Sequence, residues 1–317
     1  MHRENFQAPL VAATNEAAPA QNGTTSSRLP ARSRRKLSIV AGLVSLLPAL
    51  PWLTSGRSPA TAQKDDADAR QIVERSLVPI RRDFEAAPQF ECSEHDQDAK
   101  GSRTYLDLMI DGSDYQQLIA INDKPLSREK RAQEAQKLRD ETARREKQSR
   151  EERAQRIAKF QADQKRDHDL IAELTKAFDF KLAGVDHLGG HEVYVLHATP
   201  RRGYHPISRD TQVLTGMKGT LWIDQKSLQW VKVEAEVTHP VSIEGLMARV
   251  EPGTRFELEK MPVAPGIWLA SHFAMKSRSR VFYLFPHQKS EEETYSDYRR
   301  ISSSASTAEP QSQSPRP

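Results

Sequence analysis

The spacing of apolar residues predicts an amphipathic helix over residues 67–80. Within this segment Ile72, Ser76 and Ile80 recur at intervals of four, and further apolar residues flank them. Residues four apart lie on the same side of an α-helix, so they form a single face. We expect this face to pack onto the rest of the protein.

Two segments with alternating apolar and polar residues follow, at 103–110 and 115–122. The four residues between them read Asp-Gly-Ser-Asp. An Asp-Gly pair in this position is typical of a β-hairpin, because both residues tolerate the positive φ angles of a tight turn. The pattern therefore predicts an antiparallel pair of strands.

The segment 127–175 contains neither Gly nor Pro, and more than half of its residues are charged. It predicts a helix with Ser127 as N-cap, and at about 1.5 Å per residue an unbroken helix would reach about 70 Å. Its apolar residues are too sparse for a coiled coil. We expect a solvated middle stabilised by pairs such as Glu141 with Arg145, and contact with the core only in the last turns.

The remaining sequence has short strand-like runs separated by Gly or Pro, which is the pattern of an antiparallel meander. These runs span 178–185, 192–199, 217–224, 228–238, 253–261, 267–276, 279–285 and 292–298. The longest run alternates between an apolar face, with Val231, Val233, Ala235 and Val237, and a wet face, with Trp230, Lys232, Glu234 and Glu236. A sheet with one wet face suits helices packed on its other face.

The predicted fold class is therefore α+β. We expect a curved antiparallel sheet, which is an incomplete β-barrel, with one N-terminal helix. The long charged helix is expected to be inserted between the second and third strands. One domain at 63–301 should contain all of these elements, between a disordered N-terminal region at 1–62 and a disordered tail at 302–317.

Composition narrows the class of protein. The chain has 317 residues, 37% hydrophobic and 28% charged, with one cysteine, which excludes collagen-like, disulfide-stapled and polytopic membrane proteins. The formal net charge of +4 suggests nucleic-acid binding. However, residues 1–62 hold seven Lys or Arg and two acids, and the remainder has 40 basic residues against 41 acidic ones. The excess charge belongs to the leader, so we expect no nucleic-acid partner.

The leader has the order of an export signal: a basic run at 32–36, an apolar stretch at 37–53 and Ala-Thr-Ala at 60–62. This order predicts cleavage after residue 62 and export to the periplasm. The alternative is an uncleaved inner-membrane anchor at 37–53, with the domain facing the periplasm. Residues 33–37 also resemble the twin-arginine export motif. A lipoprotein route is excluded because the single cysteine, Cys92, lies far from the cleavage point.

Residues 219–236 resemble the central hairpin of a known family. Gly-Thr-Leu-Trp-Ile-Asp at 219–224, three further residues and Leu-Gln-Trp-Val-Lys-Val-Glu-Ala-Glu at 228–236 are similar to the periplasmic lipoprotein-carrier superfamily (LolA/LolB-like, with the related RseB-type sensors). The helix at 69–80 and the strand containing 294–298 fit the family order. The resemblance implies an incomplete barrel, helices that plug its open side, and an apolar cavity for acyl chains. The charged helix is longer than the family pattern.

The sequence shows no metalloprotease, nucleophile-elbow, Walker or dinucleotide motif, so we expect no catalytic residue, cofactor or metal. His187 and His191 flank a Gly-Gly turn, where a metal site is the alternative to ordinary surface histidines. A basic loop could hold a phosphate or a lipid headgroup, and the alternative is an ordinary solvated loop. Its candidate residues are Arg201, Arg202, Tyr204, His205 and Arg209.

Ten aromatic and apolar residues are candidates for the lining of a cavity, and the alternative is that they form the core. They are Trp222, Trp230, Phe256, Leu258, Trp268, Phe273, Met275, Phe282, Tyr283 and Phe285. The leading hypothesis is a non-enzymatic exported protein that binds an acyl chain, a lipid or a lipidated protein. The second is an envelope protein-interaction or stress-sensing module with a filled sheet and the charged helix as its binding arm. The third is a hydrolase.

Overall fold

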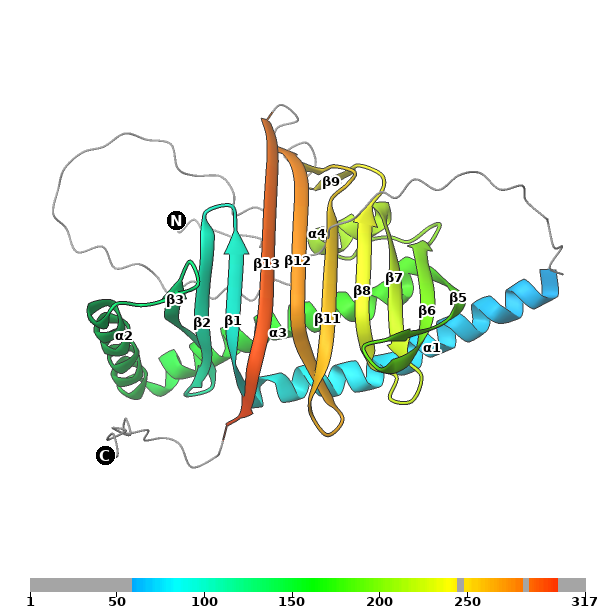
Figure 1. Ribbon diagram of the computed structural model, residues 1–317. Coiled ribbons are helices and arrows are strands. Elements are labelled where there is room, and N and C mark those ends of the chain that lie inside the picture. Colours follow the sequence, from blue (N-terminus) through cyan, green and yellow to red (C-terminus); the bar gives the residue numbers. More distant parts are fainter. Residues whose placement is uncertain (1–58, 244–247, 282–284, 302–317) are drawn as a thin grey trace.

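A computed structural model describes residues 59–243, 248–281 and 285–301. Its thirteen strands form one antiparallel sheet in the order β4-β3-β2-β1-β13-β12-β11-β8-β7-β6-β5, with β10 joining β12 to β9 (Figure 1). The strands are β1 (Phe90–Asp98), β2 (Gly101–Ile110), β3 (Ser113–Ile121), β4 (Lys124–Pro125), β5 (Phe178–Leu188), β6 (His191–Pro200), β7 (Met217–Asp224), β8 (Trp230–Val237), β9 (Val241–Ile243), β10 (Ala248–Val250), β11 (Arg255–Ala264), β12 (Ile267–Val281) and β13 (Phe285–Arg300). The sheet ends at β4 and β5 and does not close into a barrel, so the predicted α+β class with an open sheet is confirmed.

The strand β1 pairs with β13, so the first and last long strands meet inside the sheet (Figure 1). Phe90 lies opposite Arg300, and Asp98 lies opposite Glu291. This strand was not predicted, because its sequence is mostly polar. As a result four strands, not two, precede the charged helical segment.

The predicted Asp-Gly hairpin is confirmed as β2 and β3. Ile110 pairs with Ser113, which leaves a two-residue loop at Asp111 and Gly112. Both loop residues have positive φ, 48° and 84°, as a tight hairpin with right-handed strand twist requires.

The first helix, α1 (Pro59–Ala86), is longer at both ends than predicted, and a short 3₁₀ helix, η1 (Ala87–Gln89), follows it. Val73 and Ile80 are buried in the main core, as the apolar stripe predicts. The helix contacts β5, β12 and α3. Within the described ranges, no helix has an apolar run suited to spanning a bilayer. The apolar stretch at 37–53 and the tail at 302–317 lie outside the described residues.

The charged segment forms two helices, α2 (Arg128–Glu146) and α3 (Arg150–Ala177), rather than one. Ser127 caps α2 as predicted. The break is set by Ser149: its side chain accepts from the Glu152 backbone N–H, while the Glu152 carboxylate accepts from the Ser149 backbone N–H. This capping box is a strong helix-start signal and begins a new helix. In Figure 1, α1 and α3 both run behind the sheet.

The sequence between β6 and β7 contains a short helix, α4 (Arg209–Gln212), and a 3₁₀ helix, η2 (Val213–Gly216). Further along the chain, the predicted strand 267–276 and residues 279–281 of the predicted strand 279–285 form the single strand β12, whereas 292–298 belongs to the longer β13. The long β12–β13 pair results from this continuity.

One predicted strand face is wrong at its first residue. Trp230 was assigned to the wet face of β8, but it is buried in the main core. On β7, Trp222 pairs with Lys232 and Ile223 pairs with Trp230, which leaves Val231 as an extra residue. A bulge of this kind interrupts the alternation of side chains and turns Trp230 toward the helices.

Candidate functional site

Five of the ten candidate cavity residues lie together on the sheet face that packs on the helices. Trp230, Phe256 and Phe273 are buried in the main core, and Leu258 and Met275 pack against it. The same core contains residues of α1 and α3. The side chains of this chain therefore pack against one another where a guest was expected.

The other five candidates are placed differently. Trp222 and Trp268 belong to a separate apolar cluster with Val193 and Val231. Phe282 and Tyr283 lie outside the described residues, and the same holds for the side chain of Phe285.

Two hollows lie at the surface of the described part of the chain, and the seven candidates whose side chains are described border neither of these two. The first, of about 250 Å³, is lined by Arg82, Glu85, Ala86, Gln89, Phe90, Ile267 and Arg300. The second, of about 220 Å³, is lined by Glu251, Pro252, Arg278, Ser279, Arg280, His287 and Gln288. Charged and amide side chains border both hollows, which distinguishes them from the expected apolar cavity.

Polar contacts fix α1 on the sheet. The indole N–H of Trp230 donates to Ser76 Oγ at 2.8 Å. Asp83, near the end of α1, accepts from Gln229 Nε2 and from the backbone N–H of Trp268, each at 3.0 Å, and from Lys260 Nζ at 2.5 Å. These bonds satisfy buried groups on both sides, so they select one position of the helix against the sheet.

In the predicted headgroup loop, the structure shows side-chain contacts within the fold for two of the five residues. Arg201 donates to Asp179 and to the carbonyl of Phe178, and Tyr204 donates to Glu173 at 3.4 Å. These two side chains are therefore used within the fold. Arg202 and His205 are exposed, and the side chain of Arg209 lies outside the described residues.

The two candidate metal-binding histidines occupy adjacent positions of the β5–β6 ribbon. His187 pairs in register with Glu192, and His191 pairs with Leu188. Neighbouring register positions point to opposite faces of a sheet, so the two rings face apart. His191 lies 3.2 Å from Asp224 Oδ2 instead, and its ring packs edge-on against Trp268.

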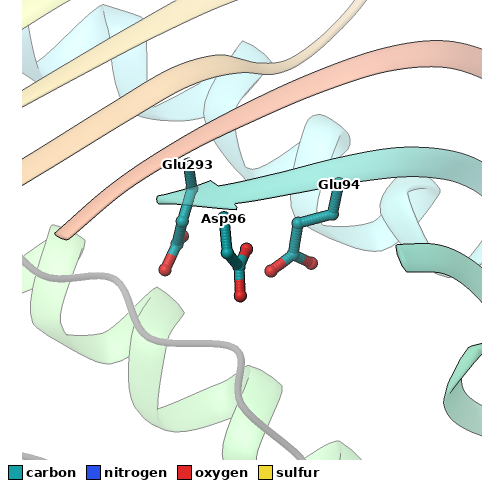
Figure 2. Close-up of side chains that lie close together, drawn as sticks. All are labelled: Glu94, Asp96 and Glu293. Carbon is teal, nitrogen blue, oxygen red and sulfur yellow. The ribbon is translucent and has the colours of Figure 1, made fainter. Parts of the chain in front are cut away.

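An unpredicted group of carboxylates lies on the helix side of β1 and β13. Figure 2 shows Glu94, Asp96 and Glu293, which we call the acidic cluster, extending from the sheet toward α3. One carboxylate oxygen from each lies within 4.8 Å of the others. Glu94 is 3% exposed and Glu293 is 5% exposed. Three oxygen ligands suit a hard cation, but carboxylates alone do not define a metal site.

Burial dominates the electrostatics of this cluster. Burial, together with the nearby charge of Asp107, raises the pKa of Glu94 to about 12. Burial also raises the pKa of Glu293 to about 8, although Tyr295 donates to Glu293 Oε2 at 2.6 Å and acts in the opposite direction. Gln116 donates to Glu94 and to Asp107, at 2.9 and 3.0 Å. The cluster therefore holds protons that the same residues lose in the unfolded chain.

A signal for this cluster was present in the sequence. Glu94 and Asp96 are two apart, as are Glu291 and Glu293, and residues two apart on a strand share a face. The pairing of Asp96 with Glu293 brings these two segments together. That pairing could not be foreseen because β1 was not recognised as a strand.

The bend between α2 and α3 is attached to the β2–β3 hairpin by arginines. Arg145 is buried, and its guanidinium donates to the carbonyls of Ile110, Ser113 and Asp114 at 2.7–3.0 Å. Arg156 and Arg153 pair with Asp111. The segment is therefore also attached to the hairpin near its middle, although the residues that it gives to the main core, Leu170, Ile171, Leu174 and Ala177, all lie in its last turns, as expected. The predicted Glu141–Arg145 pair is present at 2.6 Å.

Replacing Arg145 with alanine is expected to lower the free energy of unfolding by about 2 kcal/mol, because several buried carbonyls lose a charged donor. Lysine should not restore it, since one ammonium cannot reproduce the planar fork. Urea unfolding measures the loss, and amide exchange should increase in β2–β3. Arg144→Ala is the control, because Arg144 is exposed and pairs only at the surface. Equal losses in the two variants would contradict the assigned role of Arg145.

Comparison with known proteins gives similarity of fold. No family model matches the chain, and no curated protein matches it. A solved domain described as an outer membrane lipoprotein-sorting protein, from Vibrio parahaemolyticus, is 14% identical; the match covers 75% of this chain and 95% of that one, with a TM-score of 0.27. A LolA superfamily protein from Nitrosomonas europaea is 12% identical; the match covers 74% of this chain and 94% of that one, with a TM-score of 0.28.

A third match is a chain in the MucA/MucB complex of Pseudomonas aeruginosa. It is 11% identical, and the match covers 72% of this chain and 100% of that one, with a TM-score of 0.21. The descriptions of the first two structures name the superfamily that residues 219–236 resemble, and the similarity of this chain to each of the three is weak.

Proposed function

We propose that this protein is a non-enzymatic binding protein of the cell envelope, in which the sheet and α1 form a filled scaffold and the α2–α3 segment captures a partner protein. The observation that supports it is the packing of Trp230, Phe256 and Phe273 against α1. An acyl chain would have to displace α1, and with it the bonds from Trp230 to Ser76 and from Lys260 to Asp83.

The α2–α3 segment has the properties of a binding arm. Most side chains of α2 are exposed, and most of its residues are charged, so the helix offers many groups for ion pairs and hydrogen bonds. Arg145 and Arg156 attach the bend to the sheet, which holds the arm in one orientation. A surface that is already ordered loses less conformational entropy on binding.

Site-specific photo-crosslinking in cells tests this function. A photoreactive amino acid is placed at Arg131 or Lys137, both exposed on α2, and at Lys181 on β5 as the control. The expected result is one discrete protein adduct from both α2 positions and none from the control. The same adduct at all three positions, or none at the α2 positions, would reject the arm as the binding surface.

A second candidate function is transport of an acyl chain or a lipidated protein. It is favoured by one observation, namely that Leu258, Phe273 and Met275 share one apolar face with Trp230, so removing α1 would uncover a continuous apolar surface. Native mass spectrometry of the purified chain distinguishes the two functions. A scaffold should be recovered without lipid and should not bind a fluorescent fatty acid. A lipid retained in a fixed ratio would favour the carrier.

A further inference from the structure

The β12–β13 pair extends beyond the strands on either side of it. The last register pair of β11 with β12 is Arg255 with Lys276, and the last pair of β1 with β13 is Asp98 with Glu291. Beyond these points the two strands continue as a ribbon that only β10 flanks, along part of β12 (Figure 1). The end of this ribbon therefore has no long strand paired on either side within the described sheet.

Cations gather on one face of this ribbon. Lys276, Arg278 and Arg280 occupy alternate positions of β12, so their side chains leave the same face. Arg249 on β10 pairs in register with Arg280 and joins them. We call these four residues the basic ribbon face. Met275, at an adjacent position, packs against the core, so the basic ribbon face is the outer one.

In the part of the chain that the structure describes, Glu251 is an acid that balances part of these charges. Glu251 lies 3.5 Å from Arg249 and 3.3 Å from Arg280, and it offsets part of their repulsion. Among the described residues, neither Lys276 nor Arg278 forms an ion pair, and both are exposed. Since residues 63–317 carry almost equal numbers of basic and acidic groups, this face is a local excess of charge rather than a reflection of the whole domain.

A hollow lies on the basic ribbon face. Arg278, Arg280 and Gln288 line it together with Glu251, and its volume is about 220 Å³. Gly253 lets the guanidinium of Arg278 lie close, since a Cβ at that position would be 3.2 Å from Arg278 Nη1. Two guanidinium groups beside an open hollow can donate to the oxygens of a phosphate group.

We propose that the basic ribbon face docks the protein on an anionic phospholipid surface. Cations two residues apart on a strand are about 7 Å apart, so they meet a flat array of phosphates better than one compact ligand. Each Lys or Arg close to an anionic leaflet strengthens the attraction, and salt screens it. This docking uses the outer face of the sheet and is independent of capture by α2.

Co-sedimentation of the full chain with vesicles tests the proposal. The vesicles are phosphatidylcholine alone, or an equimolar mixture with phosphatidylglycerol. The apolar stretch at 37–53 can bind both kinds, and the basic run at 32–36 can favour the anionic kind, so the difference between vesicles is compared between the parent chain and variants of the ribbon. We expect binding to the anionic vesicles about a hundredfold stronger at low salt, with the difference lost at high salt. Equal binding to both kinds of vesicle would overturn the proposal.

Variants locate the contact. Lys276→Gln with Arg278→Gln should weaken anionic-vesicle binding about tenfold, and Lys276→Arg with Arg278→Lys should retain it. The control is Lys218→Gln with Lys226→Gln, two exposed lysines elsewhere on the sheet, with unchanged binding. If the control variant loses as much binding to anionic vesicles as the Lys276→Gln and Arg278→Gln variant, the net charge of the protein determines binding and the basic ribbon face is not the contact. Unchanged thermal unfolding shows that each variant is folded.

Two soluble competitors test which kind of anion the basic ribbon face binds: a lipid surface, a free phosphate or an acidic protein. Inorganic phosphate at constant ionic strength should displace the protein no more than chloride does, because the docking depends on many phosphates at once. A polyglutamate peptide should compete only weakly. Displacement by phosphate alone would mean a free-anion site, and tight polyglutamate binding without vesicle binding would mean an acidic protein partner. Either result would overturn docking on lipid.

Discussion

Replacing Lys260 with methionine is expected to lower the free energy of unfolding by about 3–5 kcal/mol, measured by urea unfolding. Lys260 on β11 pairs with Asp83 on α1, and the two side chains are 12% and 4% exposed. Burial lowers the pKa of Lys260, although the charge of Asp83 opposes this. Without the ammonium group, the Asp83 carboxylate is left buried with no opposite charge, and that is the costly step.

The second substitution Asp83→Asn should recover much of this loss when it is combined with Lys260→Met. An asparagine oxygen can still accept from Gln229 and from the backbone N–H of Trp268, but it carries no charge. The exposed Lys218→Met on β7 is the matched control and should change stability little. A double variant as unstable as the sum of its two single variants would show that the pair is not coupled.

The stability of the folded protein is expected to fall as the pH rises from about 4.5 to about 8. Burial raises the pKa of Glu293 in the fold from 4.5 to about 8, so in this range the folded state holds a proton that the unfolded chain has lost. The contribution of Glu293 to stability is therefore fully present below the unfolded-state pKa of 4.5 and is lost as the pH rises through the folded-state pKa of about 8. Between these two pKa values, one proton lowers the free energy of unfolding by about 1.4 kcal/mol per pH unit. Urea unfolding across this range measures the slope.

The variants Glu293→Gln and Glu94→Gln should each reduce this slope, because glutamine has no proton to lose. Both variants should be more stable than the parent protein at pH 8 and closer to it at pH 5. Glu292→Gln is the matched control, since Glu292 is the neighbour of Glu293 and its side chain is 57% exposed. If the free energy of unfolding of a double variant, with both Glu293→Gln and Glu94→Gln, still falls with pH at the parent slope, the pH dependence belongs to other groups.

Local signals in the sequence were enough to predict much of the fold. The Asp111-Gly112 turn and the apolar stripe of α1 depend on neighbours in the sequence, and both are present in the structure. The break at Ser149 was also a local signal, since Ser149 and Glu152 are three apart, but the high charge of the segment favoured one long helix. Trp230 could not be placed, because a bulge depends on the register between two strands.

The candidate site was harder to predict than the fold. The acidic cluster joins Asp96 to Glu293, nearly two hundred residues apart, and only the β1–β13 pairing brings them together. The aromatic residues were assigned to one cavity by their type alone. Trp222 and Trp268 lie in a different cluster from Trp230, because strand register decides the face on which each ring lies.

The pairing of β1 with β13 also sets the order in which the molecule can be assembled during synthesis. The β2–β3 hairpin and the β5–β8 meander can form from nearby sequence while the ribosome is still at work. The two halves of the sheet join only when the C-terminal strand has been made, and until then β1 keeps an open edge that can pair with other chains. A protein shortened before Phe285 would therefore consist of two unjoined half-sheets, and a chaperone that shields β1 would act at the slowest step.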